Sequence, residues 1–122
     1  ITQATEKLRE RYEFVLLEGA GGLMVPNDFQ SLTIDYIREQ GYPLVLVTSG
    51  KLGSINHTLL SLYAAQHYGI PVQAIVYNQY PHVDALIEAN TLEYLRIKFP
   101  EIPLLLLGDL SEEQMMDVAP LL

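Results

Sequence analysis

A single carboxylate, Glu18, stands between an apolar run and a glycine-rich turn in Phe14-Val-Leu-Leu-Glu-Gly-Ala-Gly-Gly22. The run predicts a strand at Phe14–Leu17, buried on both faces of a parallel sheet. Ligands of open α/β sheets bind beyond the carboxyl ends of the strands. Glu18 is therefore a candidate ligand for Mg²⁺, which prefers oxygen ligands. The alternative is that Glu18 ends a strand before an ordinary tight turn, and spacing alone does not decide between the two.

A second chemical feature is Gly53-Ser-Ile-Asn-His57, which opens the clearest helix pattern of the chain at Ser54–Tyr68. A helix start presents free N–H groups and a positive dipole end, so it suits a carboxylate or phosphate. The alternative is ordinary N-capping by Ser54, with Asn56 and His57 in solvent. Spacing by itself favours this alternative.

Asn78 follows the apolar run Val72–Tyr77, and its amide could read the edge of a nucleotide base. The alternative role is that of a turn residue ahead of Pro81, and spacing favours it. The histidines, at positions 57, 67 and 82, lack the local spacing of metal ligands.

Two segments begin like known phosphate-binding motifs and then depart from them. Ser49-Gly-Lys-Leu52 has Val45 where the P-loop needs its first glycine, and Leu52 where it needs Ser or Thr. Gly19-Ala-Gly21 would need a third glycine at Met24 to be a dinucleotide fingerprint. Neither motif supports a self-contained nucleotide site.

Strand and helix patterns alternate along the chain, which predicts βαβ units and a parallel sheet in one domain, residues 1–122. Expected helices are Thr2–Arg11, Leu32–Gln40 (N-cap Ser31 or Thr33), Ser54–Tyr68, Val83–Phe99 and one beginning in Ser111–Met116; expected strands are Phe14–Leu17, Pro43–Thr48, Val72–Tyr77 and Leu104–Leu107. The long helix should bury Val83, Leu86, Ile87, Tyr94 and Ile97. Because parallel strands end at one edge, we expect the following residues to gather there: Glu18, Gly53, Asn78 and Asp109.

Composition excludes several classes of function. The formal net charge is −8 at pH 7 and the pI is near 4.6, which disfavours a nucleic-acid partner. The absence of cysteine excludes disulfides and fits a cytoplasmic protein. No apolar run is long enough to span a membrane.

Taken together, the segments resemble dethiobiotin synthetase. The resemblance rests on Glu18-Gly-Ala-Gly-Gly-Leu-Met-Val-Pro26, Pro43–Val47, Lys51-Leu-Gly-Ser-Ile-Asn-His-Thr-Leu-Leu60, Ile75-Val-Tyr-Asn78 and Pro103–Leu110, in matching order and spacing. It implies a three-layer, P-loop-NTPase-like parallel sheet flanked by helices, and a homodimer. It also implies a ligase of biotin biosynthesis that forms a ureido ring from 7,8-diaminopelargonic acid and CO₂, with ATP and Mg²⁺. A substrate amine forms a carbamate, ATP phosphorylates it, and the second amine attacks the mixed anhydride.

The resemblance also assigns residues. It implies that Glu18 is the Mg²⁺ ligand and that the nucleotide contacts are Glu18, Gly19, Ala20, Gly21, Asn78 and, less closely matched, Gln79. It implies that the substrate's carboxylate tail is received across the dimer interface by Gly53, Ser54, Ile55 and Asn56.

Two departures from the family pattern shape the expectations. The family's P-loop and catalytic lysines belong to an N-terminal half, with a further strand of the sheet, that this sequence does not contain. Since the chain also begins at Ile1, we expect the C-terminal part of a synthetase, with an incomplete sheet and no turnover on its own. After Gly108-Asp-Leu110 the chain continues as Ser-Glu-Glu-Gln-Met, in place of the family's adenine-covering loop. The alternative function is a non-catalytic dimerisation or scaffold module.

Overall fold

A computed structural model describes residues 1–108 of the chain. In order along the chain, the elements are α1 (Thr2–Arg9), α2 (Thr33–Gln40), β1 (Leu44–Ser49), α3 (Ser54–His67), β2 (Val72–Asn78), α4 (Ala85–Lys98) and β3 (Leu104–Leu107). Asp109 and the expected helix in Ser111–Met116 lie outside the described residues. Within residues 1–108, no helix is long and apolar enough to cross a membrane.

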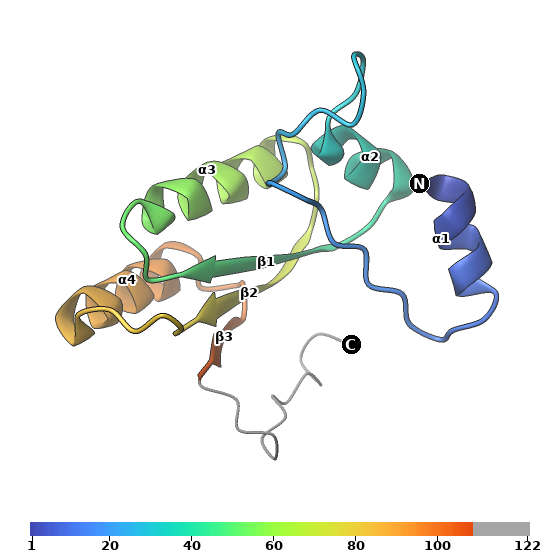
Figure 1. Cartoon of the computed structure of the whole chain (residues 1–122). Coiled ribbons are helices and arrows are strands. Elements are labelled where there is room, and N and C mark those ends of the chain that lie inside the picture. The colour runs from blue at the N-terminus through green and yellow to red at the C-terminus, as the bar shows by residue number, and fades with distance from the viewer. Residues whose placement is uncertain (109–122) are drawn as a thin grey trace.

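The three strands form one parallel sheet in the order β1-β2-β3 (Figure 1). Leu46 pairs with Ile75, which in turn pairs with Leu104, so these side chains share one face of the sheet. They pack with Leu62 of α3 and Leu95 of α4. Both crossover helices therefore cover the same face, as two right-handed crossovers in one direction require. The predicted parallel α/β fold is confirmed.

A second cluster joins α2 to the far end of α3. It contains Leu23, Ile34, Ala65 and Ile70, all buried. Ile34 is the buried residue of α2, and Gly41 ends this helix in the left-handed conformation at φ 66°, as its lack of a Cβ allows. This cluster packs against the N-terminal ends of β1 and β2. The carboxyl ends of the two strands lie away from it and lead into turns that carry polar residues.

The predicted strand at Phe14–Leu17 was wrong. Residues 14–18 make no backbone hydrogen bond to any other residue of 1–108, and the side chain of Leu16 is 96% exposed. An apolar run predicts burial in a sheet, but a strand also needs a neighbour whose backbone groups are free to pair. Within the described residues this run pairs with none, so it continues as an extended loop.

The start of α3 also differs from the prediction. Gly53 occupies the N-cap position with φ 86°, and Ser54 is the first helical residue. The left-handed backbone explains the glycine, because a side chain there would be strained. At α2, Leu32 stands at the N-cap in place of Ser31 or Thr33, and its N–H donates to the Asp35 carboxylate.

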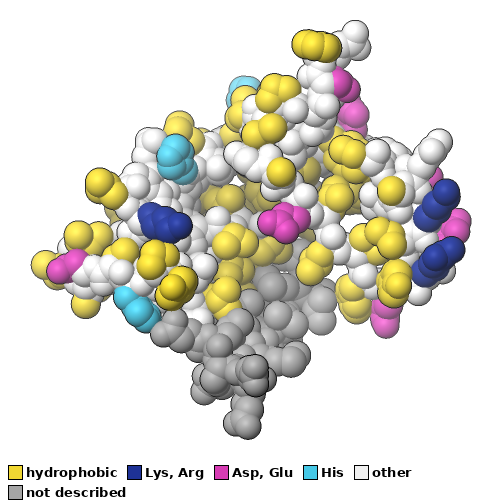
Figure 2. Space-filling view, viewed as in Figure 1, with side chains coloured by type: hydrophobic (Ala, Val, Ile, Leu, Met, Phe, Trp, Pro, Cys, Tyr) yellow, Lys and Arg dark blue, Asp and Glu magenta, His cyan; other side chains and the backbone are white. Residues whose placement is uncertain are grey.

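Helix α4 buries a different face from the one expected. Leu92 and Leu95 are its buried residues, whereas four of the predicted inward residues are exposed: Leu86, Ile87, Tyr94 and Ile97. The helix is apolar on several faces, so periodicity did not identify the inner one. Figure 2 shows that hydrophobic side chains remain widespread on the surface.

Candidate functional site

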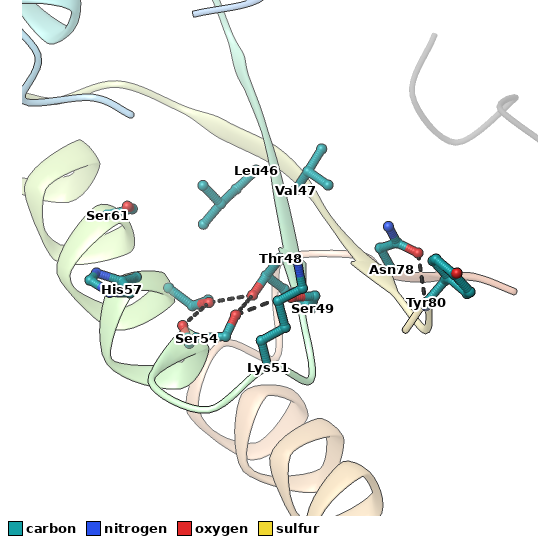
Figure 3. Close-up of a pocket in the computed structure, with 11 residues that line it drawn as sticks. Leu46, Val47, Thr48, Ser49, Lys51, Ser54, His57, Ser61, Asn78 and Tyr80 are labelled. Atoms are coloured by element: carbon teal, nitrogen blue, oxygen red, sulfur yellow. Dashed lines mark hydrogen bonds between the residues drawn. The ribbon is translucent and has the colours of Figure 1, made fainter. Parts of the chain in front are cut away.

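A cavity of about 290 Å³ lies between the carboxyl-terminal half of β1 and the first turns of α3 (Figure 3). Its lining residues are Leu46, Val47, Thr48, Ser49, Lys51, Ser54, His57, Thr58, Ser61, Asn78 and Tyr80. The cavity thus brings together Ser54 of the expected helix start and the expected base-reading residue Asn78, whereas Gly53, Ile55 and Asn56 are not among its lining residues. This agrees with the rule that ligands of parallel sheets bind at the carboxyl ends of strands.

The charge of this cavity is opposite to that of the whole chain. Its 11 lining residues include Lys51 and His57 and no Asp or Glu, although the chain carries a net charge of −8. Both side chains are exposed, and Lys51 carries a positive charge. The lining therefore suits an anion, and the positive end of the α3 dipole adds to this field.

The N–H groups at the start of α3 are not all free. The N–H of Ser54 donates to the Lys51 carbonyl at 2.9 Å, and that of His57 donates to Gly53 at 3.3 Å. The N–H groups of Ile55 and Asn56 donate to no backbone carbonyl among residues 1–108. These two are the donors that an anion could use.

The Ser54 side chain is engaged with the end of β1. Its hydroxyl lies 3.0 Å from that of Thr48 and accepts from the N–H of Ser49 at 3.3 Å. The Thr48 hydroxyl is also hydrogen-bonded to that of Thr58, one helical turn further along α3. Figure 3 shows the side chains of Thr48 and Ser54 pointing toward one another between the strand and the helix.

Asn78 and Gln79 differ in which of their side-chain atoms are already hydrogen-bonded. The side-chain oxygen of Asn78 accepts from the N–H of Tyr80 at 3.0 Å, and within residues 1–108 the Asn78 amide nitrogen donates to no partner. The Gln79 amide nitrogen donates to Glu88 at 2.6 Å, and the Gln79 backbone N–H donates to Leu107. Asn78 is therefore the better placed of the two to contact a base, and it lines the cavity.

Glu18 lies in an exposed loop, followed by Gly21 and Gly22 at φ 89° and 114°. It is absent from the lining of the cavity, and so are Gly19 and Ala20. Among residues 1–108 no group of three or more His, Cys, Asp or Glu could hold a metal. One exposed carboxylate still fits a Mg²⁺ ion that takes its other ligands from phosphates and water.

Sequence reasoning missed several cavity residues, namely Thr48, Ser49, Lys51, Thr58 and Tyr80. A signal was present for some of them. Thr48 and Ser49 are polar residues that end an apolar strand, and Thr58 follows Ser54 by one helical turn. Read together, these two spacings would have predicted a polar contact between strand and helix.

This sheet, with polar turns at its carboxyl edge, defines an α/β domain of the P-loop NTPase-like class. The model of the family described as AAA domain matches residues 1–116, and the chain belongs to this family.

Curated relatives refine that assignment. The chain is 55% identical over 96 residues to the ATP-dependent dethiobiotin synthetase BioD 2 of Haemophilus ducreyi, covering 79% of this chain and 46% of that protein. It is 59% identical over 87 residues to the protein of the same name from Haemophilus influenzae, covering 71% and 46%. The dethiobiotin synthetase BioD of Chlorobaculum tepidum is 51% identical over 110 residues, covering 86% and 46%. The resemblance to dethiobiotin synthetases is thus confirmed, and the chain spans about half the length of these relatives.

Proposed function

We propose that this chain carries the substrate-tail and nucleotide-base side of an ATP- and Mg²⁺-dependent dethiobiotin synthetase, a cytoplasmic ligase of biotin biosynthesis. The observation that carries the proposal is the cavity at the start of α3, lined by Lys51 and His57, free of acidic residues and bordered by Asn78. The similarity to ATP-dependent dethiobiotin synthetases supports the same activity.

The substrate, 7,8-diaminopelargonic acid, ends in a carboxylate that suits the start of α3. We assign the tail site to Gly53, Ser54, Ile55 and Asn56. The free N–H groups of Ile55 and Asn56 can donate to the carboxylate, and Lys51 supplies positive charge nearby. These residues hold and orient the tail, so that the amines of the other end meet the nucleotide.

The nucleotide side of the proposal rests on two segments. Asn78, and next to it Gln79, are assigned to the base, because the Asn78 amide nitrogen, which has no partner among residues 1–108, can donate to a ring nitrogen. The segment Glu18 to Gly21 is assigned to the phosphates, with Glu18 as a Mg²⁺ ligand. When bound, ATP supplies the phosphoryl group that activates the carbamate, and Mg²⁺ neutralises phosphate charge.

Residues 1–122 alone should not turn over. The sequence contains no complete P-loop motif, and phosphoryl transfer depends on a cradle of N–H groups and a lysine around the phosphates. We therefore propose that the cavity binds substrate without completing the reaction unless the phosphate-binding half is supplied.

A homodimer belongs to the proposal. Helix α4 exposes Leu86, Ile87, Tyr94 and Ile97, a large apolar surface for one helix. The same observation favours the second candidate function, a non-catalytic dimerisation module. The two candidates differ in whether the cavity binds 7,8-diaminopelargonic acid.

The experiment assays dethiobiotin formation by mass spectrometry, with ATP, Mg²⁺, bicarbonate and 7,8-diaminopelargonic acid. The protein as its gene encodes it is compared with residues 1–122. We expect product from the former and none from the latter. A gene product that dimerises but forms no dethiobiotin and binds no 7,8-diaminopelargonic acid would leave the dimerisation module as the better account.

A further inference from the structure

The side-chain amide of Gln79 is held in one orientation. Its nitrogen donates to the Glu88 carboxylate at 2.6 Å, and a carboxylate can only accept. The nitrogen therefore faces α4, and the amide oxygen lies on the opposite side. A Cβ built at Gly108 would lie 3.5 Å from that oxygen and, chain neighbours aside, within 4 Å of no other atom of residues 1–108. The oxygen is thus turned toward the residue that follows β3.

The surroundings of Gln79 maintain this orientation. Its backbone N–H donates to the Leu107 carbonyl at 2.9 Å, so the main chain is fixed as well. Gln79 and Glu88 are both partly buried, and a hydrogen bond to a charged group is strengthened where water has little access. The amide cannot turn over without placing its oxygen against the carboxylate, where two acceptors repel each other.

Asn78 and Gln79 leave opposite groups unpaired at the end of β2. The Asn78 side-chain oxygen is used by the N–H of Tyr80, and its nitrogen donates to no partner among residues 1–108 (Figure 3). In Gln79 the nitrogen is used, and within the same residues the side-chain oxygen accepts from no donor. Consecutive side chains leave a strand on opposite faces, so this donor and this acceptor flank the strand end.

An acceptor at this position separates the bases by their exocyclic groups. Adenine and cytosine carry amino groups, which donate, whereas the exocyclic oxygens of guanine and uracil accept. A fixed acceptor binds the first pair and repels the second, since two facing acceptors lose hydrogen bonds with water and gain none. The Asn78 donor does not separate the purines, because both have ring nitrogens that accept.

We propose that Glu88 is a positioning residue for nucleotide selection: it holds the Gln79 amide so that the Gln79 oxygen accepts from the exocyclic amino group of the base. The ligand class is then a nucleoside triphosphate with such an amino group, which selects ATP over GTP. The inference rests on the proposed function of Asn78 and Gln79 as the base side of the site. Glu88 itself contacts no ligand and acts through Gln79.

The test measures binding of non-hydrolysable analogues of ATP and GTP, with Mg²⁺, to the protein as its gene encodes it, by isothermal titration calorimetry. The wild-type protein should bind the ATP analogue about tenfold more tightly or better, because the GTP analogue faces a repelling acceptor. Glu88→Gln keeps the shape and a hydrogen bond, but its amide can donate or accept, so Gln79 can turn to suit either base. The two affinities should then agree within about threefold.

A second variant makes the test sharper. The Glu88→Lys side chain can only donate, so the Gln79 oxygen should face it and the Gln79 nitrogen should face the base. The preference between the two analogues should therefore reverse. Glu93→Gln is the matched control, since it neutralises an exposed carboxylate of the same helix, and it should keep the wild-type ratio. The ratio is the informative readout, because a loss of stability lowers both affinities alike.

Two results would overturn the inference. If the wild-type protein binds both analogues equally, the Gln79 oxygen does not select the base. If Glu88→Gln keeps the wild-type ratio, or lowers both affinities by the same factor, Glu88 contributes to stability alone. Failure of the proposed function looks different, because the wild-type protein would then bind neither analogue and form no dethiobiotin.

Discussion

The side-chain amide nitrogen of Gln79 donates a 2.6 Å hydrogen bond to the carboxylate of Glu88, which ties the residue after β2 to the first turn of α4. A carboxylate can only accept, so the contact also fixes which end of the Gln79 amide faces the helix. The Gln79 backbone is held at the same time by the carbonyl of Leu107 on β3. One residue thereby joins three elements next to Asn78.

This contact gives the first prediction. Glu88→Ala should lower the free energy of unfolding by about 1–2 kcal/mol, because a hydrogen bond to a partly buried carboxylate is lost. Urea denaturation measures the change. Glu93→Ala, on an exposed position of the same helix, is the control and should change the value by less than about 0.5 kcal/mol. Equal effects of the two variants would mean that the Gln79 contact contributes nothing.

The second prediction concerns Gly50, which follows β1. A Cβ built there would lie 2.5 Å from a methyl of Val83 and 2.7 Å from the Tyr77 hydroxyl. Gly50→Ala should therefore destabilise the fold by about 1–3 kcal/mol through overpacking. At Gly108 the nearest atom would be 3.5 Å away, so Gly108→Ala serves as a control of little effect. A Gly50→Ala protein with an unchanged thermal midpoint would contradict this packing.

Tyr77 provides the third prediction. Its side chain is fully buried and its hydroxyl has no hydrogen-bond partner among residues 1–108. Removing an unsatisfied buried hydroxyl without changing shape is neutral or favourable. Tyr77→Phe should thus keep or raise the free energy of unfolding, by up to about 1 kcal/mol. A clear loss of stability would reveal a partner for this hydroxyl.

The same residue makes the stability depend on pH. Burial, with a smaller contribution from the charge of Glu88, raises the pKa of Tyr77 above its ordinary value of 10.0. The unfolded chain therefore releases the proton first, so stability is complete below the unfolded pKa and falls as pH rises toward the folded pKa. Denaturation at pH 7 and above pH 10 should show a smaller decline for Tyr77→Phe than for the wild type. Tyr94→Phe, at an exposed position, should decline as the wild type does.

The fourth prediction addresses the N-cap of α4. The Asp84 carboxylate accepts from the N–H groups of Leu86 at 2.9 Å and Ile87 at 3.3 Å. Asp84→Ala should cost about 1 kcal/mol, and Asp84→Asn much less, because asparagine caps nearly as well. Thermal denaturation of both variants separates the cap from the charge. If both lose the same amount, the charge and not the cap is responsible.

The sequence was informative where local physics decides the outcome. Strands at Leu44–Ser49, Val72–Asn78 and Leu104–Leu107 lie within one residue of their predicted bounds, since short apolar runs between turn residues have few alternatives. Phe14–Leu17 has the same composition, yet it forms no strand, because pairing depends on a neighbour that composition cannot supply.

The residues of the site also fall into those that local sequence predicts and those that depend on packing. The positive helix end at Gly53–Asn56 and the strand end at Asn78 are local features, and the cavity brings Ser54 and Asn78 together. The contact between Thr48 and Thr58 depends on how α3 packs on β1, which spacing does not report. The N-cap residue of α3 is Gly53 and not the expected Ser54. The reason is that the chain enters this helix with a positive φ, which depends on the path of the backbone and not on the local sequence pattern.

The most direct measurement is the steady-state kinetics of Asn56→Pro in the protein as its gene encodes it, assayed for dethiobiotin formation. Proline removes the backbone N–H assigned to the tail at a position in the first helical turn, where proline is tolerated. The account predicts that KM for 7,8-diaminopelargonic acid rises about tenfold or more while KM for ATP stays within about twofold, because this residue serves the tail and not the nucleotide. Asn90→Ala, at an exposed position of α4, should change neither value. Equal changes in both KM values, or no dethiobiotin from the wild-type protein, would contradict the assignment of the substrate tail to the start of α3.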